Sequence, residues 1–254
     1  MGALSELSLC NDSLIRLLEA RKRWSPEARA ARDRLHSKMQ NYIGSDLHQR
    51  TMRRIQTYGL SSPEVMMQDT ETSLIATLAY PELKTLAELG AKYGLDRIVR
   101  QLGRPFIFGG SREWLDDHAI RFSKQLGQRV SETMNEAIRD FLSTAIEKGL
   151  STEETIQNML KFWKDQSEYR AEMVARTETR HSLVASEVEM QKRMGITLYD
   201  WDGCHLECPQ CGPFIEANPH SAEEIQAFNA EVHPNCIGGS NPVISEDFEP
   251  DVGF

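Results

Sequence analysis

Residues 114–148 have the sequence WLDDHAIRFSKQLGQRVSETMNEAIRDFLSTAIEK. Apolar side chains recur along this stretch three and four positions apart, which places them on one face of an α-helix. These positions are Phe122, Leu126, Val130, Met134, Ala137, Ile138, Phe141, Leu142 and Ala145. The pattern predicts one long amphipathic helix that ends at Gly149, because glycine readily adopts the left-handed conformation that terminates helices.

A second helix is predicted directly after this one. Residues 151–154 are Ser-Thr-Glu-Glu, a capping box in which the Ser and Glu side chains satisfy free backbone N–H groups at a helix start. The helix is expected to run through Trp163, and a helical composition resumes over residues 168–194. We therefore expect long helices to fill residues 114–194.

The chain before residue 114 also indicates helices separated by short breaks. Ser25 followed by Pro26 is a cap and a first-turn proline, so a helix should start there. Residues 61–64, Ser-Ser-Pro-Glu, mark a break. Two later helical patterns each finish near a glycine, and we expect Gly90 and Gly103 to end them.

Residues 104–111, Arg-Pro-Phe-Ile-Phe-Gly-Gly-Ser, cannot continue a helix. Pro and paired Gly interrupt helical hydrogen bonding, so this segment is the predicted boundary along the chain. We expect an N-terminal helical region over residues 1–110 and a second domain over residues 111–254.

The pattern changes after Gly195. Residues 196–203, ITLYDWDG, favour a strand that enters a turn. The following residues are rich in loops, with one short helix expected near residues 222–230 and an acidic tail over residues 240–254. The sequence thus predicts a predominantly helical α+β protein with a small C-terminal module over residues 196–239.

Charge is distributed unevenly along the chain, whose net charge is −9. Residues 14–58 hold eleven Lys and Arg and four Asp and Glu, whereas residues 212–254 hold eight acids and no Lys or Arg. The basic positions could contact phosphates or an acidic protein, or could form a solvated helix face. They include Arg21, Lys22, Arg23, Arg29, Arg32, Arg34, Arg50, Arg53 and Arg54.

Apolar runs are short. The longest, near residues 74–80, falls far below the roughly 20 residues that a helix needs to cross a bilayer. We expect a soluble protein without a membrane partner.

Two residue pairs near the C-terminus have the spacing of zinc ligands. Cys208-Pro209-Gln210-Cys211 is a C-x2-C pair, and His233-Pro234-Asn235-Cys236 supplies a second pair. Zinc takes four such ligands tetrahedrally, and four protein ligands leave no position open for a reacting water. We therefore predict a structural zinc held by Cys208, Cys211, His233 and Cys236. Reduced, unligated thiols are the alternative, and nearby substitutes for one ligand are Cys204, His205 and His220.

A catalytic interpretation would use an open metal with carboxylates, as in a metal-dependent nuclease. The available groups are Asp200, Asp202, His205 and Glu207. No spaced set of base, nucleophile and metal ligands emerges among them, so solvated turn carboxylates are the simpler interpretation. We predict no catalytic residue, and a protein that is not an enzyme.

The order of these features resembles a known family. Ala175-Arg176-Thr177-Glu178-Thr179 in a helix, a break at Gly195-Ile196, an aromatic strand, and the two ligand pairs follow one another. This arrangement, over roughly residues 150–239, is similar to that of the phage head morphogenesis family, the Mu F-like minor head proteins. For Arg176 and Glu178 we expect a buried ion pair that orients the helix against the zinc module.

The resemblance implies a low-copy structural component of the virion. Such a protein would be made in the bacterial host cytoplasm and would lie inside the head near the portal vertex. Its expected partners are the portal protein and the major capsid protein, and it would assist head assembly, DNA packaging or DNA exit. The basic N-terminal region is a candidate contact for packaged double-stranded DNA. The competing interpretation is a metal-dependent nuclease or a toxin-like nucleotide-transferring enzyme.

Overall fold

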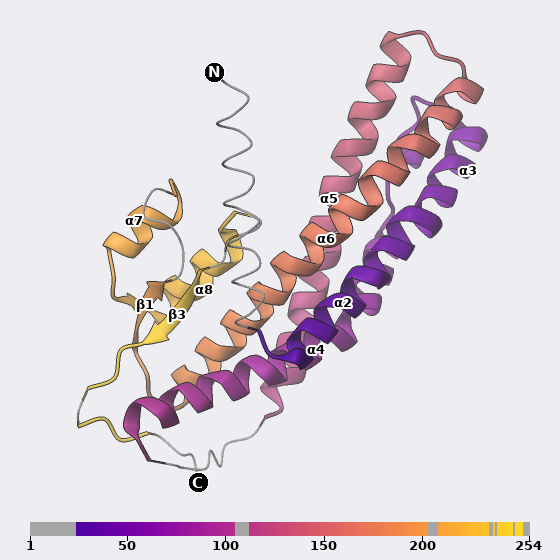
Figure 1. Cartoon of the computed structure of the whole chain (residues 1–254). Coiled ribbons are helices and arrows are strands. Elements are labelled where there is room, and N and C mark those ends of the chain that lie inside the picture. The colour runs from indigo at the N-terminus through magenta and orange to yellow at the C-terminus, as the bar shows by residue number, and fades with distance from the viewer. Residues whose placement is uncertain are drawn as a thin grey trace.

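Long helices dominate the computed structural model, and a small module lies beside the end of the last long helix (Figure 1). The structure describes residues 24–104, 112–202, 208–233, 236, 238–245 and 247–250, with the backbone alone at 165 and 166. None of the helices in these ranges is long and apolar enough to cross a bilayer.

The helices and strands follow in the order α2 (Pro26–Asn41), a π-helical segment (Tyr42–Leu47), α3 (His48–Tyr58), a 3₁₀ turn (Pro63–Val65), α4 (Asp69–Leu102), α5 (Trp114–Glu147), α6 (Thr152–Arg193), β1 (Leu198–Asp202), α7 (Cys211–Glu216), β2 (His220–Ser221), α8 (Ala222–Glu231) and β3 (Gly239–Pro242). The three strands form one antiparallel sheet in the order β2-β1-β3. The predicted class, a predominantly helical α+β protein, is confirmed. Apolar Leu14, Ile15, Leu17 and Leu18 also predict a helix after residues 11–13, which lies outside the described residues.

Local capping signals fix several helix ends where the sequence predicted them. The Ser25 side chain accepts a hydrogen bond from the Ala28 N–H at the start of α2. Ser151 and Glu154 form the expected reciprocal capping box at the start of α6. The predicted amphipathic helix is α5, and Gly149 follows it with a φ of 64°.

The last long helix is continuous where the sequence suggested an interruption. α6 runs unbroken through 42 residues, from Thr152 to Arg193. Residues 164–167 contain no Pro or Gly, so nothing there stops the helix. Trp163 is buried just before them and Ser167 is buried at their end, so the core-facing side of the helix continues through the segment.

The prediction that Gly90 ends a helix is wrong. α4 continues through Gly90 and Gly94 and ends only at Leu102, followed by Gly103 with a φ of 65°. A Cβ at Gly90 would lie 2.0 Å from the Ser186 Oγ and 2.4 Å from the Leu183 carbonyl oxygen, both on α6. Gly90 is therefore glycine because two helix backbones approach closely there, as in other close helix contacts.

Helices α4 and α6 each contribute residues to two clusters of buried apolar side chains. The larger cluster fills the bundle of α2 to α6 and includes Leu35, Leu83 and Trp163. The smaller joins the ends of α4 and α6 to the sheet, and includes Ile98 and Trp201. Both clusters draw residues from each side of residues 104–111, so the predicted boundary segment connects helices that pack into the same cores.

Part of the predicted basic region is used inside the bundle. Several of its side chains pair with carboxylates on other helices: Arg32 with Glu172 at 2.7 Å, Arg34 with Glu82 at 2.7 Å, and Arg54 with Glu71 at 2.9 Å. Glu71 and Glu82 are buried, and a buried carboxylate requires such a partner. The expectation of a purely solvated or DNA-facing basic surface is corrected at these three positions. Arg29, Arg50 and Arg53 remain exposed, and Arg21 to Arg23 lie outside the described residues.

We predict that Gly90→Ala lowers the free energy of unfolding by about 1–3 kcal/mol, because the added methyl group must push α6 away. Alanine is more stable than glycine in a helix interior by about 1 kcal/mol. A net loss of stability would therefore show that the steric cost at the α4–α6 contact exceeds this gain in helix propensity. Urea unfolding at constant protein concentration measures it. A stabilised variant would contradict the close approach of α4 and α6.

Acid should destabilise the bundle partly through His118. This side chain is buried, stacks on Phe122 with ring centroids 4.4 Å apart, and has a pKa lowered from 6.5 to about 4 by burial and then by Arg121. The folded state holds the neutral ring, so its stabilising contribution is complete above pH 6.5 and declines as the pH falls toward 4.

We predict that His118→Phe, which keeps a planar ring, loses less stability than the wild type as the pH falls. The difference should reach up to about 3 kcal/mol near the lower end of this range. Urea unfolding of both proteins across the range measures it. Parallel pH dependence of the two proteins would show that His118 does not contribute.

Candidate metal centre

The central strand β1 organises the C-terminal module, which we define as residues 196–245. β1 pairs with β2 through Leu198 opposite Ser221, and with β3 through Trp201 opposite Ser240. The side chain of Trp201 is almost completely buried, at 1% exposure. The start of the predicted acidic tail is therefore part of the sheet, because residues 240–242 form most of β3.

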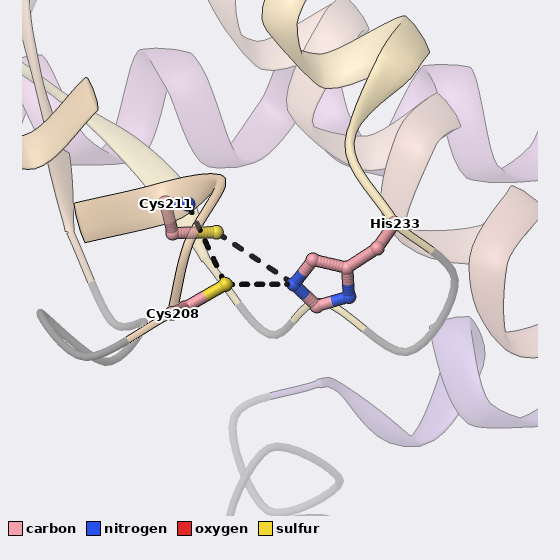
Figure 2. A group of neighbouring side chains, drawn as sticks. All are labelled: Cys208, Cys211 and His233. Carbon is pink, nitrogen blue, oxygen red and sulfur yellow. Dashed lines mark hydrogen bonds between the residues drawn. The ribbon is translucent and has the colours of Figure 1, made fainter. Parts of the chain in front are cut away.

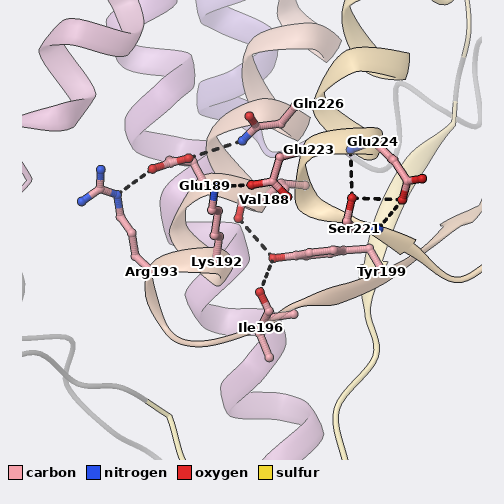
Figure 3. Close-up of polar contacts among 10 residues, drawn as sticks. All are labelled: Val188, Glu189, Lys192, Arg193, Ile196, Tyr199, Ser221, Glu223, Glu224 and Gln226. Atoms are coloured by element: carbon pink, nitrogen blue, oxygen red, sulfur yellow. Dashed lines mark hydrogen bonds and ion pairs between the residues drawn. The ribbon is translucent and has the colours of Figure 1, made fainter.

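Polar contacts hold the module against the end of α6 (Figure 3). The Tyr199 hydroxyl donates to the carbonyl oxygens of Val188 and Ile196, and Lys192 pairs with Glu223 at the start of α8. A capping box of Ser221 and Glu224 begins α8. The Lys192–Glu223 ion pair and the capping box fix the start of α8, and α8 in turn positions the residues that follow it.

Arg180 ties the predicted Arg-Thr-Glu helix to the module. Its guanidinium donates to the Gly238 carbonyl oxygen at 3.1 Å and to the Asn229 side-chain oxygen at 2.7 Å. It also lies over the Trp201 ring, 5.4 Å from the centroid. The sequence did not single out Arg180, since nothing local distinguishes it from neighbouring arginines.

Glu178 has the buried position that the sequence suggested, but its ion pair points elsewhere. Both carboxylate oxygens accept hydrogen bonds from Arg129 of α5, at 2.8 and 2.7 Å. Burial raises the pKa of Glu178, and Arg129 opposes that rise. Glu178 therefore fastens α6 to α5 and is not paired with Arg176, and Arg180 of the same helix contacts the module.

Three of the four predicted ligands lie together at one end of the module (Figure 2). Cys208 and Cys211 come from the turn that begins α7, and His233 follows α8. The His233 Nε2 lies 3.3 Å from the Cys208 Sγ and 3.8 Å from the Cys211 Sγ. Their ligand atoms all lie within 4.8 Å of one another, close enough to hold a metal ion.

The fourth predicted ligand, Cys236, lies beside Cys211 but is not part of the group whose ligand atoms all lie within 4.8 Å of one another. The Cys236 Sγ is 3.6 Å from the Cys211 Sγ, and it accepts a hydrogen bond from the Gly238 N–H at 3.3 Å. A tetrahedral zinc site has edges of about 3.5–3.8 Å between its sulfur and nitrogen ligands. The separations of 3.3, 3.8 and 3.6 Å are close to that range.

The surroundings favour the thiolate form of Cys208. Burial acts to raise its pKa, but hydrogen bonds from the backbone of Cys211 and Gln210, followed by contacts with Cys211 and His233, outweigh burial and lower the pKa from 9.0 to about 7. The thiolate is the form of cysteine that binds metals. The backbone N–H of His233 also donates a hydrogen bond to the Gln210 side-chain oxygen at 2.8 Å. This bond joins the two turns that carry the ligands.

The alternative ligands and catalytic groups are placed differently. His220 stacks on Phe214, with ring centroids 3.7 Å apart, and its Nε2 lies 2.7 Å from the Phe214 carbonyl oxygen. Asp202 accepts a hydrogen bond from Asn241 on β3. Among the residues that the structure describes, neither Asp200 nor Asp202 belongs to a group that could hold a metal. Cys204, His205 and Glu207 lie outside the described ranges.

No protein-family model matches the chain, and no curated protein or solved structure is significantly similar to it. The resemblance to the head morphogenesis family therefore stays a prediction, carried by the residues quoted for it above.

We predict that divalent zinc or cobalt raises the melting temperature of the chain and that a chelator reverses the effect, because metal binding is coupled to folding of the module. The Cys208→Ser/Cys211→Ser variant should lose both the effect and the thiolate-to-cobalt absorption. Cys236→Ser should weaken binding if the fourth ligand is correct. Cys10→Ser, far from this cluster in sequence, is the control and should behave as the wild type.

Equal responses of the wild type and the double variant would show that these cysteines do not bind the metal. Loss of cobalt absorption in Cys10→Ser would assign part of the binding to a different thiol.

Proposed function

We propose that Cys208, Cys211, His233 and Cys236 bind one structural zinc ion. Two thiols of this set are buried, with Cys211 at 0% and Cys236 at 7% exposure. With four protein ligands, the ion would have no open position for water or substrate. Its role would be to stabilise a small module, to whose folding it could contribute on the order of 10 kcal/mol.

We further propose that the chain is a structural minor head protein of a tailed phage. The observation that carries this proposal is the attachment of the cysteine-histidine module to the Arg-Thr-Glu helix through Arg180. The resemblance rests on the same two features in the same order along the chain. In this proposal the protein binds the portal and the major capsid protein inside the head, and assists assembly, packaging or DNA exit.

The long helices suit a structural role of this kind. α5 and α6 have 34 and 42 residues, and Arg129 and Glu178 lock them together. A rigid bundle can present a distant module to a partner without rearranging. Contact with packaged DNA would fall to the exposed Arg29, Arg50 and Arg53, since Arg32, Arg34 and Arg54 are paired within the bundle.

Purified heads of the encoding phage provide the test. We expect quantitative mass spectrometry to find this chain at low copy number, and to find less of it in heads assembled with the Cys208→Ser/Cys211→Ser variant. Absence from purified heads would contradict the structural role.

A nuclease assay of the isolated chain with magnesium or manganese separates the enzymatic alternative. We expect no cleavage of DNA, because a closed zinc site activates no water. Metal-dependent cleavage that co-purifies with the wild type and is lost in Asp200→Asn or Asp202→Asn would replace the structural proposal with a nuclease.

A further inference from the structure

A cavity of about 170 Å³ lies between α4, α6 and β3. Its apolar walls come from the half-buried aromatic rings of Trp24 and Tyr93 and from Leu183 and Val184. A cavity of about 150 Å³ holds one benzene ring, so this space fits a single planar ring system. None of the four proposed zinc ligands lines it.

Both hydrogen-bond donors and hydrogen-bond acceptors line this cavity. The Ser240 Oγ is buried and has no hydrogen-bond partner among the described residues. The Glu187 Oε1 is contacted there by the Arg97 Nε at 3.0 Å and the Gln191 Nε2 at 3.5 Å. Arg97 is held in place by further bonds to the Ser240 carbonyl oxygen and the Asn241 side chain. The cavity therefore offers fixed donors and acceptors beside apolar walls.

The Glu187 carboxyl group can act as a hydrogen-bond donor or as an acceptor, depending on its ionisation. Burial raises its pKa to about 7, and Arg97 and Arg100 oppose that rise. Near neutral pH both forms of the carboxyl group are present, so it can accept or donate a hydrogen bond. Such a group can meet the edge of a ring that carries both ring N–H groups and carbonyl oxygens.

A wider cleft lies next to the cavity. Trp24, Tyr93 and Arg97 line both spaces, and the cleft, of about 790 Å³, adds Arg100. Arg100 is exposed, and its Nε donates to the Asp96 carbonyl oxygen of its own helix. Asp96 also lines the cleft, and its carboxylate faces Lys92 at 3.8 Å. Guanidinium groups beside aromatic rings are the combination that binds a phosphate next to a stacked base.

We propose that this cavity and the adjacent cleft bind a nucleotide, with the base in the smaller space and the phosphate beside Arg97 and Arg100. A simple anion would meet the carboxylates of Glu187 and Asp202. A purely apolar ligand would leave the Ser240 Oγ without a partner, which is costly in a buried site. The nucleotide could be free or could be the end of a single DNA strand, since both present the same groups. The inference depends on neither the zinc site nor a role in the head.

Isothermal titration calorimetry of the full-length chain tests the proposal. The probes are the four deoxynucleoside monophosphates, the matching deoxynucleosides, inorganic phosphate and a short 5′-phosphorylated single-stranded oligonucleotide. Gly239→Leu should fill the cavity, and Gly239→Ala is its control, because a Cβ there lies an ordinary 3.9 Å from the Val184 Cγ2. Arg100→Gln removes the phosphate contact, and Arg139→Gln on α5, also exposed, is its control.

We expect at least one monophosphate to bind more tightly than its nucleoside and than phosphate. Arg100→Gln should weaken binding about tenfold, and Gly239→Leu should abolish it, while both controls stay within about twofold of the wild type. Tighter binding of the oligonucleotide would identify a strand end as the source, and equal or weaker binding would identify the free nucleotide.

Three results would overturn the proposal. These are no binding of any nucleotide, phosphate binding as tight as nucleotide binding, and unchanged affinity in a folded Gly239→Leu variant. Melting curves establish whether that variant folds. If the Gly239→Leu variant does not fold, the surface substitution Arg100→Gln serves as the test. Unchanged nucleotide affinity in that variant would reject the phosphate site.

Discussion

The close approach of α4 and α6 is the contact on which the rest of the molecule depends. At Gly90 and Gly94 a Cβ would collide with the α6 backbone, at 2.4 Å from the Leu183 carbonyl oxygen and 2.7 Å from the Glu187 carbonyl oxygen. This proximity lets side chains from both helices contribute to each apolar cluster. It also brings Arg97 within reach of Glu187 and of β3. The bundle and the module are thus built on one helix pair.

Buried carboxylates with partners on other helices specify how the bundle assembles. Glu71, Glu82, Glu178 and Glu187 are all buried, and each meets an arginine from a different helix. Removing Arg129 would take away the ion-pair partner of the buried Glu178, at a cost of about 3–5 kcal/mol, whereas Glu82 would keep Lys38 at 2.8 Å. Such pairs disfavour alternative helix registers more than they add net stability. They also account for Arg34 and Arg54 in the N-terminal helices without any contact to nucleic acid.

Arginine side chains also connect the module to the bundle, here through hydrogen bonds to backbone carbonyl oxygens. Arg180 reaches the Gly238 carbonyl oxygen, and the Gly238 N–H donates to the Cys236 sulfur. A metal held at Cys236 would therefore order the backbone that receives Arg180. Arg97 holds the neighbouring residues of β3 in a similar way. The cavity that we propose for a nucleotide lies between these two arginines.

The sequence by itself determined the features that arise from neighbours along the chain. Capping at Ser25 and Ser151, the amphipathic face of α5 and the spacing of the Cys and His pairs depend on residues a few positions apart. Only the tertiary structure decided what Gly90, Arg54 and Arg180 do. A glycine that ends a helix and one that admits a neighbouring helix look alike in sequence, as do a solvated arginine and a paired one. Their partners lie on other helices, and only packing brings them together.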